Sequence, residues 1–230
     1  MSEELVNFYN QLPNELKVSK MENVGFKNHG IKLPCRLLIS GPSGRGKTLS
    51  ILNFLKLCQD KKKGTFDHIT IFTKKNEQLY EYMKYKNPKN VSIHEINDGD
   101  TIPGVDTFDT GLRHFIIFDD LINDRHLFPI IKDFFIRCRK TKPYPISICF
   151  LTQDFRATDA TIRKNCTNTF IFKPSTNREL KVLFQDLPLL NNKYILDKLD
   201  SKTNDMFNFA NIDNDENTIR INFGKIVNSD

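Results

Sequence analysis

The sequence predicts an α/β fold in which helices cover both faces of a mostly parallel central sheet. Short, continuously apolar runs typical of buried strands alternate along the chain with longer segments of helical periodicity. The chain has 230 residues, 39% of them hydrophobic, which is enough for one large domain with a substantial core. The clearest strand signals are CRLLIS at 35–40, HITIFT at 68–73, RHFIIFDDL at 113–121 and ISICFLT at 146–152.

Helix and strand signals alternate as they do in sheets whose parallel strands are joined by crossover helices. The tail differs: residues 206–226 alternate around an Asn/Asp turn, which is typical of a β-hairpin. The remaining expected elements are a helix from residue 47, a helix at 76–85, an edge strand at 91–96, a helix at 125–140, a short helix at 160–165, a strand at 168–174 and a helix at 177–187.

A glycine-rich loop joins the first strand to the first long helix. Glycines let backbone N–H groups approach phosphate oxygens, and the positive end of the following helix dipole favours the same anion. We expect Lys47 to reach the β- and γ-phosphates of a nucleotide and the Thr48 hydroxyl to bind Mg²⁺. The pattern G-x-x-x-x-G-K-[ST] spans the expected nucleotide-binding residues Gly41, Pro42, Ser43, Gly44, Arg45, Gly46, Lys47 and Thr48.

Two consecutive acids follow the apolar strand HFIIF. Asp119 ends the strand, where its carboxylate can hold Mg²⁺ together with Thr48, as a Walker B acid does. Asp120 can then orient and deprotonate the attacking water, so paired acids indicate a hydrolase. The alternative is that Asp120 only caps the loop after the strand, as Asp often does.

A third polar residue, Gln153, ends the strand ISICFLT. We expect this strand to lie between the strands that carry the P-loop and the paired acids. The Gln153 amide would then sense the γ-phosphate or position the water, linking hydrolysis to movement. Its significance comes from its order in the chain, after Lys47 and Asp119.

Composition narrows the environment and the partners. The apolar runs are far shorter than the roughly 20 residues of a membrane span, and the start of the chain does not have the character of a signal peptide, so we expect a soluble, intracellular protein. A net charge of +6, with lysines clustered near predicted loops, permits a polyanionic partner. The cysteines lie mostly in apolar segments and lack a C-x-x-C pair, which indicates reduced core residues: Cys35, Cys58, Cys138, Cys149 and Cys166.

The order of these motifs resembles a known family. The segments RLLISGPSGRGKT, FIIFDDL, RCRK, ISICFLTQDF and TIRKN, within residues 33–174, are similar to the genome-packaging ATPases of poxviruses, other large DNA viruses and virophages, in the HerA-FtsK branch of P-loop motors. The resemblance implies a RecA-like P-loop NTPase fold and ATP-driven movement of double-stranded DNA into a capsid. Asp120 stands where many relatives carry Glu, and Cys138 follows Arg137 where similar proteins often carry His.

The resemblance also implies a ring with active sites between subunits, for which we expect five or six copies. Such a ring needs a cation donated to the neighbour's γ-phosphate, where charge develops in the transition state. Arg139 is the first choice, Arg137 the second at that position, and Arg163 a further possibility. For each arginine, a plain surface or ion-pair role is the alternative.

We divide the chain into an N-terminal appendage at 1–32, a P-loop ATPase core at 33–175, and a C-terminal helical segment and hairpin at 176–230 that complete the same domain. The expected cofactors are ATP and Mg²⁺, and the expected partners are double-stranded DNA, other copies of the chain, and the capsid vertex or other virion proteins, with no membrane. The expected location is the viral factory in the host cytoplasm, or the virion.

Two other functions remain open on the sequence. GPSGRGKT also resembles the P-loop of guanylate-type kinases, although the sequence shows no arginine-rich lid and a kinase has little use for paired acids followed by Gln153. A P-loop switch with slow turnover, in which the nucleotide regulates assembly, is the other alternative.

Overall fold

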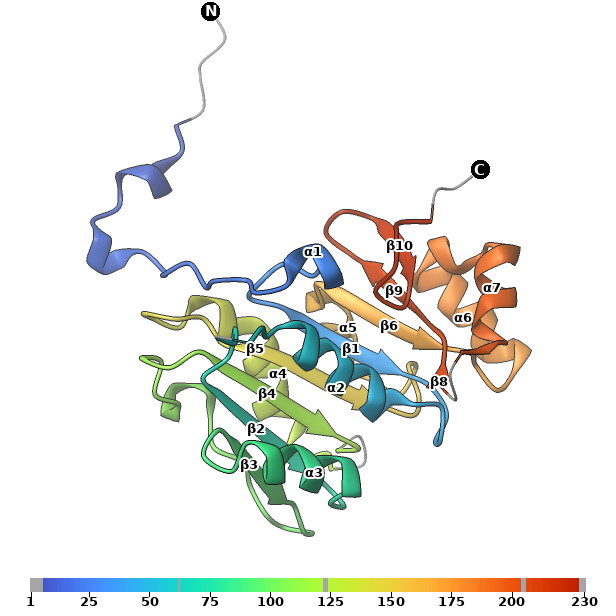
Figure 1. The fold of residues 1–230 in the computed structure, drawn as a ribbon, viewed down its shortest axis with the longest axis horizontal. Coiled ribbons are helices and arrows are strands. Elements are labelled where there is room, and N and C mark those ends of the chain that lie inside the picture. The colour runs from blue at the N-terminus through green and yellow to red at the C-terminus, as the bar shows by residue number, and fades with distance from the viewer. Residues whose placement is uncertain (1–5, 62, 122–123, 204–205, 228–230) are drawn as a thin grey trace, which may run out of the picture.

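The computed structural model describes residues 6–61, 63–121, 124–203 and 206–227 (Figure 1). Its main feature is an eight-stranded sheet in the order β10-β9-β6-β1-β5-β4-β2-β3. Strands β1 to β6 pair in parallel, whereas β9 is antiparallel to both β6 and β10. The strands are β1 (Arg36–Ser40), β2 (His68–Thr73), β3 (Val91–Glu95), β4 (His114–Asp119), β5 (Ser147–Thr152), β6 (Asn168–Phe172), β9 (Phe209–Asp213) and β10 (Thr218–Ile221).

Helices cover both faces of the sheet. Figure 1 shows α2 and α3 in front of the strands and α4 and α5 behind them. The helices are α1 (Phe26–His29), α2 (Lys47–Leu57), α3 (Gln78–Lys86), α4 (Phe128–Arg137), α5 (Ala160–Asn165), α6 (Asn177–Asp186) and α7 (Lys193–Leu199). Short 3₁₀ turns are η1 (Phe8–Gln11), η2 (Asn14–Leu16), η3 (Val105–Thr107), η4 (Cys138–Lys140) and η5 (Pro188–Leu190).

Each face of the sheet has its own apolar core. Successive side chains of a strand point to opposite faces, so Leu37 joins the cluster under α2 and α3 while Leu38 joins the cluster under α4 to α7. Strands β1, β4 and β5 are buried along their whole length, which explains their continuously apolar sequences. The predicted α/β fold with a mostly parallel sheet is confirmed.

Several local expectations were wrong or incomplete. The helix expected at 125–140 begins at Phe128, and the chain continues beyond Arg137 as the turn η4. The segment 206–226 is divided, because β8 (Met206–Phe207) pairs with β7 (Lys202–Thr203) and only β9 forms the hairpin with β10. Helices α1 and α7, of four and seven residues, were not predicted from the sequence.

The N-terminal segment extends away from the sheet as an arm (Figure 1). Phe8 and Tyr9 are 69% and 79% exposed, and the backbone N–H of Ser19 donates to the Pro143 carbonyl where the arm meets the body. The domain boundaries proposed from the sequence stay a prediction. Within the described ranges, every helix is too short or too polar to cross a membrane.

A buried side chain on the central strand β5 should contribute strongly to stability. Phe150 on β5 is fully buried in the core under α4, so Phe150→Ala should lower the free energy of unfolding by about 3–5 kcal/mol in urea denaturation. Ile136→Ala on the outer side of α4, where the side chain is 48% exposed, should change it by less than about 1 kcal/mol. Equal effects of the two changes would contradict the packing described for β5.

Candidate nucleotide-binding site

The predicted loop, acids and glutamine meet at the carboxyl edge of three adjacent strands. The N–H of Gly41, after β1, donates to the Thr152 carbonyl, and the N–H of Asp120, after β4, donates to the Leu151 carbonyl. Strand β5 therefore holds the loop on one side and the acids on the other, as expected for the strand that carries Gln153. A cavity of about 460 Å³ opens here, lined by Ser43, Gly44, Gly46, Lys47, Thr48, Leu49, Thr73, Lys75, Asn76, Glu77, Leu79, Asp119, Asp120, Leu151, Thr152 and Gln153.

The glycine loop depends on two conformational requirements. Gly44 and Gly46 have φ of 73° and 90°, in the left-handed region that side chains rarely adopt. A Cβ at Gly41 would lie 2.6 Å from Cβ of Phe172, because the loop passes tightly over the end of β6. The loop leads directly into α2, which begins at Lys47, so the positive end of an 11-residue helix faces the cavity.

Lys47 brings a partly buried cation to the cavity. Its Nζ donates to the carbonyl oxygens of Gly41 and Pro42 at 2.8 and 3.2 Å. Burial lowers the pKa of Lys47, whereas the negative charges of Asp119, Asp120 and other acids raise it. The ammonium therefore lies in the electrostatic field of the carboxylates at the end of β4. A bound phosphate chain with Mg²⁺ would come between the ammonium and these carboxylates.

Asp119 is a buried carboxylate with a defined orientation. Only 7% exposed, it accepts a hydrogen bond at Oδ2 from the Tyr80 hydroxyl at 2.8 Å. Burial raises the pKa of Asp119 to about 6, although the bond from Tyr80 and the charge of Lys47 act in the opposite direction. Carboxylate and hydroxyl oxygens are the donors that Mg²⁺ prefers, so Asp119 and Thr48, which line the same cavity, fit this ion.

Tyr80 was missed by the sequence analysis. It lies on α3 with a fully buried side chain, and burial is the largest cause of its strongly raised pKa. Tyrosine is common on helices, and 39 residues separate it from Asp119, so no local pattern shows this contact. Its hydroxyl fixes the carboxylate, which makes Tyr80 a positioning residue for Asp119.

Asp120 and Gln153, which follow the adjacent strands β4 and β5, contact each other at the cavity. The Gln153 Nε2 lies 3.4 Å from both carboxylate oxygens of Asp120. Asp120 has a φ of 54°, a left-handed conformation that Asp tolerates better than most residues but that still costs free energy. The left-handed backbone of Asp120 gives its side chain a direction different from that of Asp119. The Gln153 amide then restricts the orientation of the Asp120 carboxylate.

Arg139 and Arg137, the first two candidates for the cation between subunits, lie near the amino end of β5, opposite the cavity. Arg139 is on η4, which precedes the start of β5, whereas Gln153 follows its end, so the roughly 20 Å length of this strand separates them. Arg139 is exposed and lies near the buried Arg36, whose pKa is lowered by burial and by the charge of Arg139. Arg137 is held by Asp106 and Asp133. Neither arginine can reach the cavity of its own chain, and their role between subunits stays a prediction.

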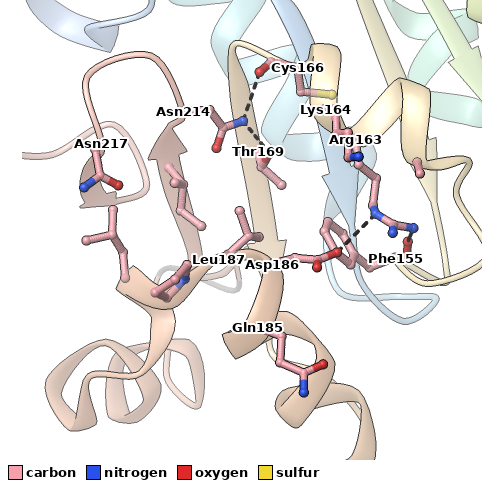
Figure 2. Close-up of a pocket in the computed structure, with 14 residues that line it drawn as sticks. Phe155, Arg163, Lys164, Cys166, Thr169, Gln185, Asp186, Leu187, Asn214 and Asn217 are labelled. Carbon is pink, nitrogen blue, oxygen red and sulfur yellow. Dashed lines mark hydrogen bonds and ion pairs between the residues drawn. The ribbon is translucent and has the colours of Figure 1, made fainter.

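Arg163 is held within its own chain. Figure 2 shows its guanidinium directed toward Asp186 and the ring of Phe155. Its Nε lies 3.3 Å from Asp186 Oδ2, and Nη1 donates to the Thr158 carbonyl at 2.6 Å. These contacts belong to a second cavity of about 470 Å³ between α5 and the α6–η5 region, which is separate from the cavity of Lys47. An intramolecular role accounts for the contacts of Arg163.

The fold and this cavity define the class: the chain has the fold of a P-loop NTPase. No protein-family model and no curated protein matches the sequence. Similar folds are found among solved structures. The genome packaging NTPase B204 from Sulfolobus turreted icosahedral virus 2, in complex with AMP, aligns with a TM-score of 0.56 over 83% of this chain and 98% of its own at 12% identity.

Two further structures extend this comparison. The DNA-packaging ATPase B204 from Sulfolobus turreted icosahedral virus has a TM-score of 0.56 over 86% of this chain and all of its own, at 13% identity. EssC (ATPases 2 and 3) from Geobacillus thermodenitrificans has a TM-score of 0.52 and 10% identity over 83% of this chain and 39% of its own. At these identities the likeness establishes the fold, which is the fold that the resemblance implied.

The contact between Tyr80 and Asp119 predicts a pH-dependent effect. Tyr80→Phe removes a donor to a buried carboxylate, so it should lower the free energy of unfolding by about 1–3 kcal/mol at about pH 8, where Asp119 is ionised. The loss should be smaller at about pH 5, because Asp119 is then largely protonated. Chemical denaturation at both pH values tests this.

Tyr82→Phe is the matched control for this prediction. Tyr82 lies on the same helix but is 57% exposed, so its change should alter the stability by less than about 0.5 kcal/mol at either pH. If Tyr80→Phe had the same effect at both pH values, the hydroxyl would not act through the charge of Asp119.

Proposed function

We propose that the protein is an ATP-hydrolysing motor that moves double-stranded viral DNA into a capsid. The observation that carries this proposal is the convergence of Lys47, Asp119, Asp120 and Gln153 on one cavity beside a phosphate-binding loop. A cation, a metal-binding acid, a second acid and an amide are the parts that a nucleotide-hydrolysing site needs. The order of the three motifs follows that of packaging motors.

The fold comparisons support the nucleotide and the cargo. B204 is described as a genome packaging NTPase, with structures in complex with AMP, ATP-gammaS and AMPPCP. Nearly the whole B204 chain aligns with the protein. We infer that ATP is the substrate here and that DNA is the polymer moved, with the modest net charge of +6 favouring a polyanion.

Each residue of the cavity has a separate task in hydrolysis. Lys47 and the loop N–H groups would bind the β- and γ-phosphates, while Thr48 and Asp119 would hold Mg²⁺, which neutralises charge on the phosphate oxygens. Asp120 would accept the proton of the attacking water. Gln153, hydrogen-bonded to Asp120, would keep that carboxylate and the water in line and respond when the γ-phosphate leaves.

The position of Arg139 supports a ring. An exposed arginine at the opposite edge of the sheet can complete only a neighbour's site, and charge on the transferred phosphoryl group is what it would stabilise. We propose a ring of five or six copies with DNA as its partner, attached to the capsid vertex or another virion protein. It would work in the viral factory of the host cytoplasm or in the virion.

Phosphate release with and without double-stranded DNA tests the proposal. A motor should hydrolyse ATP with Mg²⁺ and be stimulated by long DNA of any sequence, less so at high salt, because the contacts would be to phosphates. A guanylate-type kinase would instead require a nucleoside monophosphate, and a switch would respond to neither. Either of these outcomes would contradict the motor.

A substitution can distinguish the proposed role of Asp120 as a base from the proposed role of Asp119 as a metal ligand. Asp120→Asn should leave ATP affinity unchanged and reduce hydrolysis by about 10²-fold or more, since it removes a positioned base. Asp197→Asn, on the exposed side of α7, is the control and should leave both unchanged. If binding and turnover fell together in Asp120→Asn, Asp120 would be a structural group or a metal ligand.

Mixing two inactive variants tests the arginine. Arg139→Ala should bind ATP normally and fail to hydrolyse it, whereas Lys47→Ala should lose binding or turnover. Mixed rings should recover activity, because one variant supplies the loop and the other the arginine. Arg137→Ala is the comparison and should retain activity, since Arg137 is bound to Asp106 and Asp133. Full activity of Arg139→Ala would exclude Arg139 as the cation donated between subunits, and full activity of a diluted monomer would exclude the ring.

A further inference from the structure

Arg45, inside the glycine loop, contacts an aromatic side chain from the far end of the sequence. Its guanidinium carbon lies 4.7 Å from the centre of the Phe207 ring, and Lys202 Nζ lies 4.5 Å from the same centre. Phe207 is on β8 and is half-buried, so part of its side chain is exposed beside the loop. Figure 1 shows β8 next to the loop that follows β1.

The same contact extends to the first turns of α2. Asn53 Nδ2 donates to the Leu49 carbonyl at 2.8 Å and lies 4.0 Å from the sulfur of Met206, the residue before Phe207. A hollow of about 320 Å³ continues from this point, at the lower end of the range for small-molecule sites. It is lined by Asn53, Lys56, Leu57, Met206, Phe207, Asn208, Phe209, Asn222 and Phe223.

The orientation of a nucleotide in the loop follows from the positions of the acids. Asp120 and Gln153 are on the β4 and β5 side of the loop, so the γ-phosphate must lie there. On its other side the loop passes over the end of β6, where Gly41 meets Phe172. The nucleoside must therefore leave toward β6 and α2, which is the side on which Phe207 lies.

We propose that Phe207 stacks on the base of the bound nucleotide and that Arg45 and Lys202 flank this stack. The proposal rests on nucleotide binding at the loop and adds the site for the base. Aromatic rings stack on any base through its π face, and the energy grows with the overlapping area. The site therefore favours purine over pyrimidine nucleotides, and the side chains of Arg45 and Lys202, which lie over the ring, must move aside for the base to stack.

A tryptophan at this position can report the stack directly, since the protein has none of its own. In Phe207→Trp, ATP should quench the fluorescence of the new indole by stacking on it, and CTP should do so less. Tripolyphosphate, which offers the phosphates without a base, should bind the loop without quenching. Tyr85→Trp is the control: Tyr85 also lies under a lysine but at the far end of α3, so neither ligand should change its fluorescence.

A second variant measures the contribution of the ring to affinity. Phe207→Ala should weaken ATP binding in calorimetry by about 10-fold or more and leave the affinity for tripolyphosphate unchanged. Quenching by tripolyphosphate as well as ATP, or unchanged ATP affinity in Phe207→Ala, would overturn the base site while nucleotide binding stood. If the unmodified protein bound neither ligand, the proposed function itself would fail, and the base site with it.

Discussion

The parallel alignment of β1, β5 and β4 is the constraint on which the site depends. Parallel strands place their carboxyl ends at one edge, so the segments that follow them meet although they are far apart in the chain. Two backbone hydrogen bonds set this meeting, from Gly41 to the end of β5 and from Asp120 to the end of β5. The side chains of the loop, the acids and Gln153 could not converge if β5 were elsewhere in the sheet.

The cavity combines charges that are costly to bury. Asp119 is almost fully enclosed, and burial raises its pKa although Tyr80 and Lys47 act to lower it. In the proposed function, Mg²⁺ entering with the phosphates would supply positive charge next to this carboxylate. The buried ends of the strands supply the low dielectric that makes these interactions strong.

Different edges of the molecule carry different parts of the proposed function. The carboxyl edge of the sheet carries the loop and the paired acids, and the amino edge exposes Arg139, for which we propose a role in the site of another copy. Phe207, which contacts Arg45 of the loop and lines a hollow beside α2, is the residue proposed to receive the base. A nucleotide bound in this way would contact the loop, the acids and the C-terminal segment at once, so its hydrolysis could move these parts relative to one another.

The sequence by itself determined the loop, the paired acids, the glutamine strand and the alternating fold, because each depends on neighbouring residues whose spacing is local. Gly41 to Thr48 form a continuous pattern, and Asp119 follows directly from an apolar strand. The tertiary structure alone decided the hydrogen bond from Tyr80 to Asp119, the contact of Arg45 with Phe207, and the edge on which Arg139 lies. The two contacts join residues 39 and 162 positions apart, and the position of Arg139 depends on the strand order. Neither long-range contacts nor strand order produce a local pattern in the sequence. The division of residues 206–226 into β8 and β9 was missed for the same physical reason, since only pairing with β7 separates them.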